Sequence, residues 1–585
     1  MNAARVSTVA LVGLFVSQPV PAQSADRPSL HRRIPHPAVA DPNEDAADAT
    51  FGWSMVMGDV NGGTSADELV ITSFFLDVDP FGPGTIADVG AAYPFYTRAL
   101  IPHPHPKLDA QNPELKLHLG RLYPAIGDVH EEVSGERLVF LGAIGADVDY
   151  GGGNVVTDGG TVEVFDLNLP AASDPNVLSL AAPTASSEQA PTGPGYPAGL
   201  RSFGHGIATG DIDGDGHDEL VVGAHDSDVG QGRVYVFFSH GGFLNNPYRF
   251  WVGLRSPAGQ SESFGASVLV ADLNGDGLGE LVVGATERYL QPAPPTTRPG
   301  RVYVFDAQTV LGLAQYDLHV QAADQELVPP AGLDNNGQWF GWTLFDVGDL
   351  GGTDFALGTS RGDLAVHAEA TDWPGEGALP PVDMAGALFV FMARDAGDVL
   401  APGDPPLLNP DPVVLQTPVI THQGVPVHQP QHVTRFGRGA AAVEWRNGTE
   451  ELRGLLVGDP NADVQDPNDP AYPNATPVVD AGRVFFFRAP LDVPGGTDNA
   501  WSDWVLLEPS DALSQGSGAP PMAPMSTATS LTPQADAHFG AWIVSGKYNF
   551  LVEEDQFAVC ARQRTLGTDP EAGQVYTFTW PDPGP

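Results

Sequence analysis

The chain has 585 residues, more than one ordinary domain needs, so it consists of several domains or of repeated units. Its formal net charge of −46 would repel phosphate backbones and anionic lipids, which argues against nucleic acid as a partner. Charged residues make up 17% of the chain and apolar residues 42%, so the acidity belongs to a globular protein and not to a disordered one.

Residues 1–22 have the pattern of a secretory signal peptide. Arg5 precedes an apolar run over 9–16, and Val20-Pro21-Ala22 supplies the small residues that favour cleavage after Ala22. The run is too short to cross a bilayer, and no later stretch approaches the roughly 20 apolar residues of a transmembrane helix. We therefore expect an exported protein, secreted or held at the cell surface, with no transmembrane segment.

One sequence phrase then recurs along the chain: Phe-Gly, a short run of small and apolar residues, an acidic turn, an apolar strand ending near Gly, and a Gly-led aromatic strand. Seven copies start at Phe51, Leu119, Phe203, Phe264, Phe340, Phe436 and Phe539. Only the second copy, which begins Leu-Gly, departs from Phe-Gly. A phrase repeated over most of a chain indicates a repeat architecture, whose core grows with each added unit.

Each copy contains apolar runs with the composition of buried β-strands. In the third copy Glu219–Ala224 is followed by 232–237, and in the fifth copy the corresponding runs are 356–358 and 386–391. Because these runs are continuously apolar, both faces of each strand must be covered. Blades stacked around an axis provide that cover, whereas a two-layer sandwich would give alternating strands. With Cys560 as the single cysteine, no intramolecular disulfide forms, and packing or metal must stabilise the blades.

The Phe-Gly starts, the Asp-x-Asp-Gly-Asp-Gly turns and the Val-Val-Gly-Ala strands resemble FG-GAP repeats, as in the propeller of integrin α-subunits. The resemblance extends from about Phe51 to Trp580. It implies an all-β fold, a seven-bladed β-propeller of four-stranded blades with long Pro-rich surface loops. We expect 30–39 to complete the last blade. The chain is accordingly assigned as 1–22 signal peptide, 23–50 N-terminal segment, 51–580 propeller and 581–585 C-terminal tail.

Two of the acidic turns carry oxygen donors at positions 1, 3, 5 and 9 of a nine-residue loop. The donors are Asp211, Asp213, Asp215 and Glu219 in the third copy and Asp272, Asn274, Asp276 and Glu280 in the fourth. The backbone carbonyls of His217 and Leu278, at position 7, would complete the two sets. Calcium takes six to eight oxygen ligands, so both loops are predicted to bind calcium as a cofactor. A plain hairpin turn also favours Asp, Asn and Gly, but it has no use for an acid at position 9.

Two further turns are weaker metal candidates because their donor sets are incomplete. They contain Asp59, Asn61 and Asp67 in the first copy and Asp128 in the second. No Gly-x-Ser-x-Gly elbow, His-Glu-x-x-His helix, P-loop or Cys-x-x-Cys pair occurs, and we assign no catalytic residue. Arg361-Gly362-Asp363 spells the tripeptide that integrins read on their ligands, but a three-residue match carries little weight.

Three functions are compatible with this sequence. The first is a calcium-binding, rigid and non-catalytic scaffold that binds an extracellular protein or glycan, with cell adhesion as its setting, as the resemblance to integrin propellers implies. The second is a secreted hydrolase or lyase whose active site lies in the central channel, where several blades would assemble it without a local motif. The third is a structural surface-layer or matrix component, for which we find no anchor motif. We favour the first, because it needs no catalytic motif.

Overall fold

The computed structural model describes residues 29–37, 44–45, 49–60, 68–75, 77–78, 89–96, 101–102, 107–110, 118–121, 123–129, 137–150, 155–170, 172–183, 200–240, 242–259, 261–286, 300–330, 333, 339–350, 362–373, 380–393, 407–422, 425–447, 450–465, 471, 474–489, 502–507, 534–546, 556–564 and 571–579. Within them the structure is almost entirely β. The two helices, α1 (Ser227–Gly230) and α2 (Ala307–Leu311), are each little more than one turn. No helix in this part of the chain is long and apolar enough to cross a membrane.

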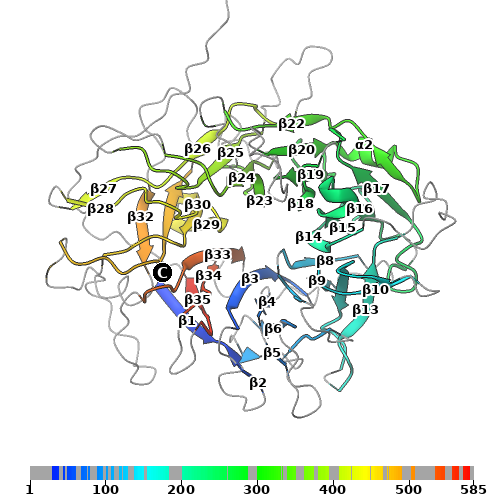
Figure 1. Cartoon of the computed structure of the whole chain (residues 1–585), viewed down its shortest axis with the longest axis horizontal. Helices are drawn as coiled ribbons and strands as arrows, with labels where there is room; N and C mark the ends of the chain where they lie inside the picture. Colours follow the sequence, from blue (N-terminus) through cyan, green and yellow to red (C-terminus); the bar gives the residue numbers. More distant parts are fainter. Residues whose placement is uncertain are drawn as a thin grey trace, which may run out of the picture.

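Seven sheets of four or five strands stand around one axis and form a seven-bladed β-propeller (Figure 1). We number the blades 1 to 7 in chain order. Blade 1 contains β3 (Phe51–Gly58), β4 (Glu68–Ser73), β6 (Ala91–Tyr96) and β7 (Ile101–Pro102), and blade 2 contains β8 (Ala125–Gly127), β9 (Leu138–Ala143), β12 (Thr161–Phe165) and β13 (Asn176–Ala181). Blade 3 contains β14 (Phe203–Gly210), β15 (Glu219–Ala224), β16 (Arg233–Phe237), β17 (Trp251–Arg255) and the parallel β21 (Leu318–Val320). Blade 4 contains β18 (Phe264–Ala271), β19 (Glu280–Ala285), β20 (Arg301–Phe305) and β22 (Gln325–Leu327).

Blade 5 contains β23 (Phe340–Asp346), β24 (Leu364–Ala368), β25 (Ala387–Phe391) and β26 (Val413–Leu415). Blade 6 contains β29 (Ala440–Asn447), β30 (Glu450–Asp459), β31 (Arg483–Arg488) and β32 (Ser502–Leu507). Blade 7 contains β33 (Phe539–Gly546), β34 (Gln556–Ala561), β35 (Gln574–Thr579) and β1 (Ser29–Pro35). Three two-stranded ladders form separate sheets, made of β2 (Glu44–Asp45) with β5 (Asp77–Val78), β10 (Val148–Asp149) with β11 (Val155–Val156), and β27 (Ile420–His422) with β28 (Val425–His428).

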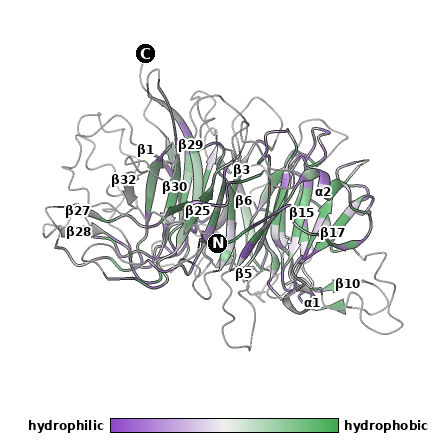
Figure 2. Ribbon diagram, turned by 90° about the horizontal axis from the view of Figure 1, so that it is seen from above, coloured by the Kyte–Doolittle hydropathy of each residue, from purple (hydrophilic) through white to green (hydrophobic). Residues whose placement is uncertain are grey.

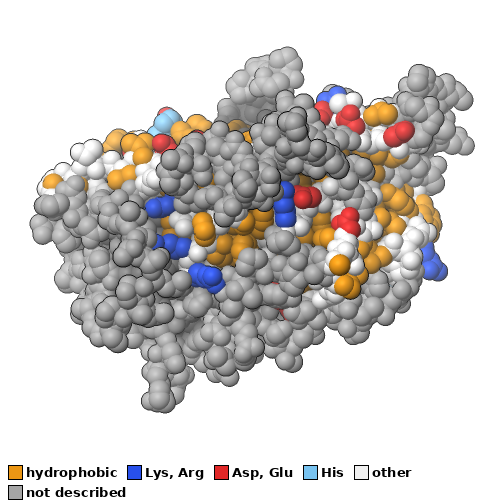
Figure 3. All heavy atoms as spheres, turned by 90° about the horizontal axis from the view of Figure 1, so that it is seen from below, with side chains coloured by type: hydrophobic (Ala, Val, Ile, Leu, Met, Phe, Trp, Pro, Cys, Tyr) orange, Lys and Arg blue, Asp and Glu red, His pale blue; other side chains and the backbone are white. Residues whose placement is uncertain are grey.

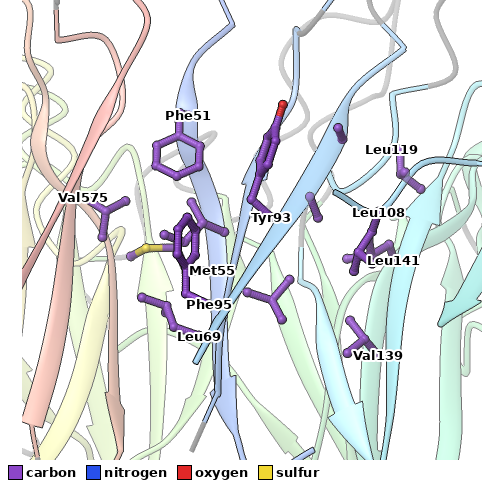
Figure 4. Packing of buried hydrophobic residues seen from close by; sticks show 14 of the residues in the cluster. Phe51, Met55, Leu69, Tyr93, Phe95, Leu108, Leu119, Val139, Leu141 and Val575 are labelled. Carbon is purple, nitrogen blue, oxygen red and sulfur yellow. The ribbon is translucent and has the colours of Figure 1, made fainter. Parts of the chain in front are cut away.

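The hydrophobic core lies between neighbouring blades. Every residue of β15 and of β19 is buried, as the continuously apolar sequence of these strands predicts. In the cluster drawn in Figure 4, Phe51 and Met55 of blade 1 share one core with Val575 of blade 7 and Leu141 of blade 2. Figure 2 shows the hydrophobic strands side by side through the body of the ring. Because the core is shared, a single blade cannot cover its own strands.

Glycine allows adjacent blades to meet at the level of the backbone. A Cβ added to Gly223 in β15 would lie 2.1 Å from the carbonyl oxygen of Gly265, near the start of β18 in the next blade. Gly265 has a φ of +87°, which residues with side chains rarely adopt. Gly265 of the Phe-Gly pair therefore marks a contact between blades at an irregularity in the pairing of β18 with β19.

The two ends of the described chain meet in blade 7. Strand β1 pairs antiparallel with β35, so a segment from the N-terminal side of the propeller provides the outer strand of the last blade. On the inner side of the ring, Trp542 of blade 7 donates a 2.9 Å hydrogen bond from Nε1 to the carbonyl oxygen of Met55 in blade 1. These contacts close the ring by joining blade 7 to both its own N-terminal strand and blade 1.

The fifth blade differs from the sequence expectation in one strand. The second strand of this blade is β24, which pairs with β23 on one side and β25 on the other. The prediction of that strand at 356–358 is therefore wrong, and 356–358 itself lies outside the described residues. His367 interrupts the apolar run of β24, so this strand did not show the continuously apolar pattern that the prediction relied on. In the fold the His367 side chain is fully buried.

Candidate metal centres

The acidic loop of blade 3 connects β14 to β15 and is held by its own carboxylates. Asp211, at position 1, accepts hydrogen bonds from the backbone N–H of Gly214 at 2.6 Å and of Gly216 at 3.0 Å. Asp213 accepts from the N–H of Asp215 at 3.2 Å. The two glycines have φ values of +80° and +88°, so the turn requires residues without a Cβ at positions 4 and 6.

The loop of blade 4, between β18 and β19, repeats this geometry. Asp272 accepts from the N–H of Gly275 at 2.6 Å and of Gly277 at 3.0 Å, the same distances as in blade 3. Asn274 takes the place of Asp213 and accepts from the N–H of Asp276 at 2.8 Å. The two loops have different side chains at position 3 and still adopt matching conformations. The loop conformation therefore depends on the spacing of the oxygen donors and glycines, which the two loops share.

The glutamates at position 9 anchor each loop to the blade. Glu219 accepts a 2.8 Å hydrogen bond from the N–H of Ile212, and Glu280 accepts one of the same length from Leu273. Both side chains are fully buried. Burial, reinforced by the charge of Asp213, raises the pKa of Glu219 to about 8. A cation at the loop would favour the ionised form of this buried acid.

Three carboxylates of the blade 3 loop converge on one point. Asp211, Asp213 and Glu219 each offer an oxygen, and these oxygens all lie within 4.8 Å of one another. The Oδ2 atom of Asp213 is buried, and it accepts no backbone hydrogen bond among the described residues. Burial and then the neighbouring Asp215 raise the pKa of Asp213. A set of clustered hard oxygens that includes a buried carboxylate fits calcium, which prefers oxygen ligands at flexible geometry.

A histidine from another part of the blade also reaches this loop. His240 follows β16, and its ring nitrogens lie 3.0 Å from Oδ2 of Asp213 and 3.1 Å from Oδ2 of Asp215. Its ligand atom and those of the two aspartates form a second group within 4.8 Å. Sequence reasoning missed His240, because nothing in the spacing of the loop points to a residue beyond the next strand. In blade 4 the residue at the same distance after the Arg-Val-Tyr-Val-Phe strand is Gln308.

The comparisons with known proteins bear on these two loops. A family model of the FG-GAP repeat matches residues 203–237 and 264–305, which contain both of them. These two segments match the FG-GAP repeat. Integrin alpha-PS2 of Drosophila melanogaster is 32% identical over 179 residues, covering 29% of this chain and 12% of that protein. Integrin alpha-4 of Xenopus laevis is 30% identical over 188 residues, covering 30% of this chain and 14% of the integrin. The matches therefore span about one eighth of the length of these relatives.

Two solved structures are similar to this chain at low sequence identity. The Dos1 propeller superposes with a TM-score of 0.32 at 11% identity and covers 90% of this chain and 95% of its own. The rhamnogalacturonan lyase YesW gives a TM-score of 0.23 at 13% identity, covering 64% of this chain and 65% of its own.

The weaker metal candidates belong to blades 1 and 2. Asp59 lies among the described residues, whereas Asn61 and Asp67 lie outside them. Asp128 of blade 2 contacts the loop of blade 3: its N–H donates to Asp218 Oδ2 at 2.8 Å, and its carboxylate lies 3.4 Å from the ring of His217. This acid therefore joins two blades.

The Arg-Gly-Asp tripeptide of blade 5 ends in a buried residue. Asp363 is 1% exposed, and its carboxylate accepts hydrogen bonds from the N–H of Leu350 at 2.8 Å and of Ala393 at 2.7 Å. The bond to Leu350 matches the one from Ile212 to Glu219, so Asp363 has the position 9 anchoring role of its repeat. Its carboxylate is occupied within the blade and is not presented to an adhesion receptor.

Aromatic side chains meet across the inside of the ring. The Tyr123 hydroxyl of blade 2 donates to the carbonyl oxygen of Trp342 in blade 5, and the Tyr123 ring lies 5.8 Å from that of Trp542 in blade 7. The Trp342 ring lies 6.4 Å from that of His205 in blade 3. Side chains from four blades therefore occupy the axis at this level.

Proposed function

We propose that this FG-GAP protein is secreted and acts as a calcium-stabilised, rigid and non-catalytic scaffold that binds an extracellular protein or glycan. The observation that carries the calcium part is the identical conformation of two acidic loops in adjacent blades, at Asp211–Glu219 and Asp272–Glu280. Export is supported by the signal-like sequence of residues 1–22, which lie outside the described residues.

Calcium would be held by groups that the loops already bring together. In blade 3 these are the carboxylates of Asp211, Asp213 and Glu219, joined by Asp215 and by the carbonyl of His217. The bound cation supplies charge neutralisation. It would remove the repulsion among these acids and offset the cost of burying Glu219, which is fully buried at the start of β15.

The binding role is supported by the likeness to integrin α-subunits and by the architecture. A closed ring with a shared core presents its loops from a rigid frame, as a binding surface requires. The side shown in Figure 3 presents hydrophobic side chains among basic and acidic ones, which suits a polar macromolecular partner. The alternative of a channel enzyme has weaker support, because Tyr123 and Trp342 meet across the axis.

A capture experiment tests this proposal. The purified chain is immobilised and exposed to a matched extracellular fraction in calcium or in chelator, and retained protein and glycan are both identified. We expect a specific partner that is retained in calcium and lost in chelator. The double variant Asp213→Asn with Asp276→Asn should retain less partner, while Asp411→Asn, which removes an exposed acid outside both loops, should behave as the unaltered chain. Equal retention by all forms would contradict calcium-supported binding.

A further inference from the structure

Three arginines gather at the end of the blades opposite the acidic loops. Arg435 and Arg438 flank the Phe-Gly pair that opens blade 6, and Arg562 directly follows β34 in blade 7. In each blade the Phe-Gly pair lies beside the end of the second strand, as Phe539 opposite Ala561 does in blade 7. The acidic loops, by contrast, join the end of the first strand to the start of the second.

The backbone brings the arginines of blades 6 and 7 together. A Cβ on Gly439, the neighbour of Arg438, would lie 2.8 Å from the carbonyl oxygen of Gly540 in blade 7. The first strand of blade 7 begins there and pairs with the strand that ends just before Arg562. The Arg562 guanidinium lies 4.6 Å from the ring centroid of Trp53 in blade 1, so the cluster reaches the closure of the ring.

Arg562 is buried, and one nitrogen of its guanidinium has no hydrogen-bond partner among the described residues. The residue is 5% exposed, and its Nε donates no hydrogen bond among the described residues. Arg438 is 8% exposed. Arg435 lies 3.0 Å from the carboxylate of Glu369, whose charge also acts on Arg562. Burial and then the charge of Arg438 lower the pKa of Arg562, so this guanidinium lies in a cationic environment.

Two other buried arginines, Arg483 and Arg233, have carboxylate partners. Arg483 is completely buried and donates to Asp459 from Nε at 2.9 Å and from Nη2 at 2.7 Å. Arg233 donates to both carboxylate oxygens of Asp228 at 2.7 Å. A buried guanidinium normally requires such a partner, because desolvation of the charge is costly. The Nε of Arg562 differs from that of Arg483 and of Arg233 in having no such partner among the described residues.

We propose that Arg562, Arg438 and Arg435 form a binding site for an oxyanion, a carboxylate or a phosphate group. The planar guanidinium fork matches both groups through paired N–H donors, and Arg562 already has its ring-facing side fixed on Trp53. The bound oxyanion takes the place of the missing acidic partner. The site goes beyond the proposed scaffold function and is independent of the calcium loops at the other end of the blades.

The net charge of the whole protein also favours anion binding at this site over the rest of the surface. With a net charge of −46, the surface repels anions in general. An anionic group is therefore held only where cations are concentrated and water is partly excluded, as at Arg562 and Arg438. Two neighbouring histidines add no positive charge there, because burial lowers the pKa of His367 and of His538 to about 3.

Titration with simple anions tests the site. The full chain is titrated with acetate, phosphate and chloride at constant ionic strength, and binding is followed by calorimetry and by the melting temperature, in calcium and in chelator. We expect saturable binding of one molar equivalent of acetate or phosphate with a rise in melting temperature in both conditions. Acetate alone identifies a carboxylate ligand, and phosphate alone identifies a phosphate ligand. Equal, unsaturable effects of all three anions, or no binding by any of them, would overturn the proposal.

Variants connect the binding to the arginines. Arg562→Gln should weaken oxyanion binding at least tenfold, and Arg562→Lys, which keeps the charge but loses the fork, should give an intermediate loss. Arg438→Gln serves as a second variant in case Arg562→Gln does not fold. The control is Arg255→Gln, a half-buried arginine near Asp228 on blade 3, which should bind oxyanion as the unaltered chain does. Unchanged binding by folded Arg562→Gln or Arg438→Gln would refute the assignment.

Discussion

The backbone N–H of Gly279 donates a 2.7 Å hydrogen bond to the carbonyl oxygen of Asp211, so the acidic loop of blade 4 is tied directly to that of blade 3. The same bond recurs between neighbouring blades, from Asp218 to Asp128 at 2.7 Å and from Gly362 to Asp272 at 2.9 Å. Each acidic loop is therefore a joint between blades. A metal that orders the loop also strengthens the contact with the next blade.

Removal of calcium should destabilise the whole ring. At a calcium concentration a hundredfold above the dissociation constant, each site adds about 2.7 kcal/mol to the free energy of unfolding. We expect chelator to lower the melting temperature markedly and calcium to restore it, as measured by differential scanning calorimetry. Magnesium at the same concentration should restore less, because it demands stricter octahedral geometry. A melting temperature that is the same in chelator and in calcium would refute structural calcium.

The variant Asp213→Asn should remove one of the two calcium sites. The amide keeps an oxygen that can accept from the N–H of Asp215, as Asn274 does in blade 4, but a carboxylate is lost from the converging group. We expect calcium binding at blade 3 to weaken about tenfold or more, by about 1.4 kcal/mol, while blade 4 is unaffected. Calorimetric titration would show one tight site in place of two. Asp411→Asn is the matched control and should keep both.

The glycine contacts between blades predict a strong steric effect. In Gly223→Val, the new Cβ would lie 2.1 Å from the carbonyl oxygen of Gly265, and neither backbone can move without opening the shared core. We expect a loss of about 3 kcal/mol in the free energy of unfolding. In the control Gly312→Ala, the Cβ would meet no atom closer than 3.3 Å at an ordinary helical φ of −73°, and stability should change little. Urea unfolding monitored by tryptophan fluorescence compares the two.

Acid should destabilise the protein partly through buried histidines. Burial lowers the pKa of His36 to about 3, below the value of 6.5 for the free group. Between pH 6.5 and pH 3 the unfolded chain therefore takes up a proton that the folded chain excludes, so stability falls as the pH falls through this window. The slope is about 1.4 kcal/mol per pH unit for one such histidine. Urea unfolding at pH 5.0 to 6.5 should show a slope smaller by this amount in His36→Gln, whereas His319→Gln, at a partly exposed site, should match the unaltered chain.

Closure of the ring should depend on β1. Ile34 is 4% exposed and pairs with Val575 of β35. Replacing it in Ile34→Asp places an unpaired charge in this buried position, at a cost of about 3 kcal/mol, and should expose the edge of β35. Faster hydrogen exchange at the amides of β35 is the direct readout. Pro35→Ser, at an exposed position of the same strand, should leave both stability and exchange unchanged.

Local sequence determined most of the blades and both acidic loops. The strands β15 and β19 begin and end where their apolar runs do, because a strand buried on both faces must be continuously apolar. The loops at Asp211 and Asp272 adopt matching geometry, because alternating acids and glycines leave the backbone few other turns. The strand β24 escaped sequence reasoning because a buried histidine, His367, breaks its pattern.

Only the tertiary structure decided which residues of different strands and blades contact one another. The approach of His240 to Asp213, the use of Asp363 as a buried anchor and the gathering of Arg562 with Arg438 all join residues from separate strands or separate blades. No periodicity encodes such contacts, because they arise only when the ring closes and places the start of one blade against the strands of the one before it. Hydrogen bonding within a turn and hydrophobic patterning act over a few residues, so the local sequence specifies the strands of each blade. The contacts between blades are specified only by the packing of seven blades around one axis.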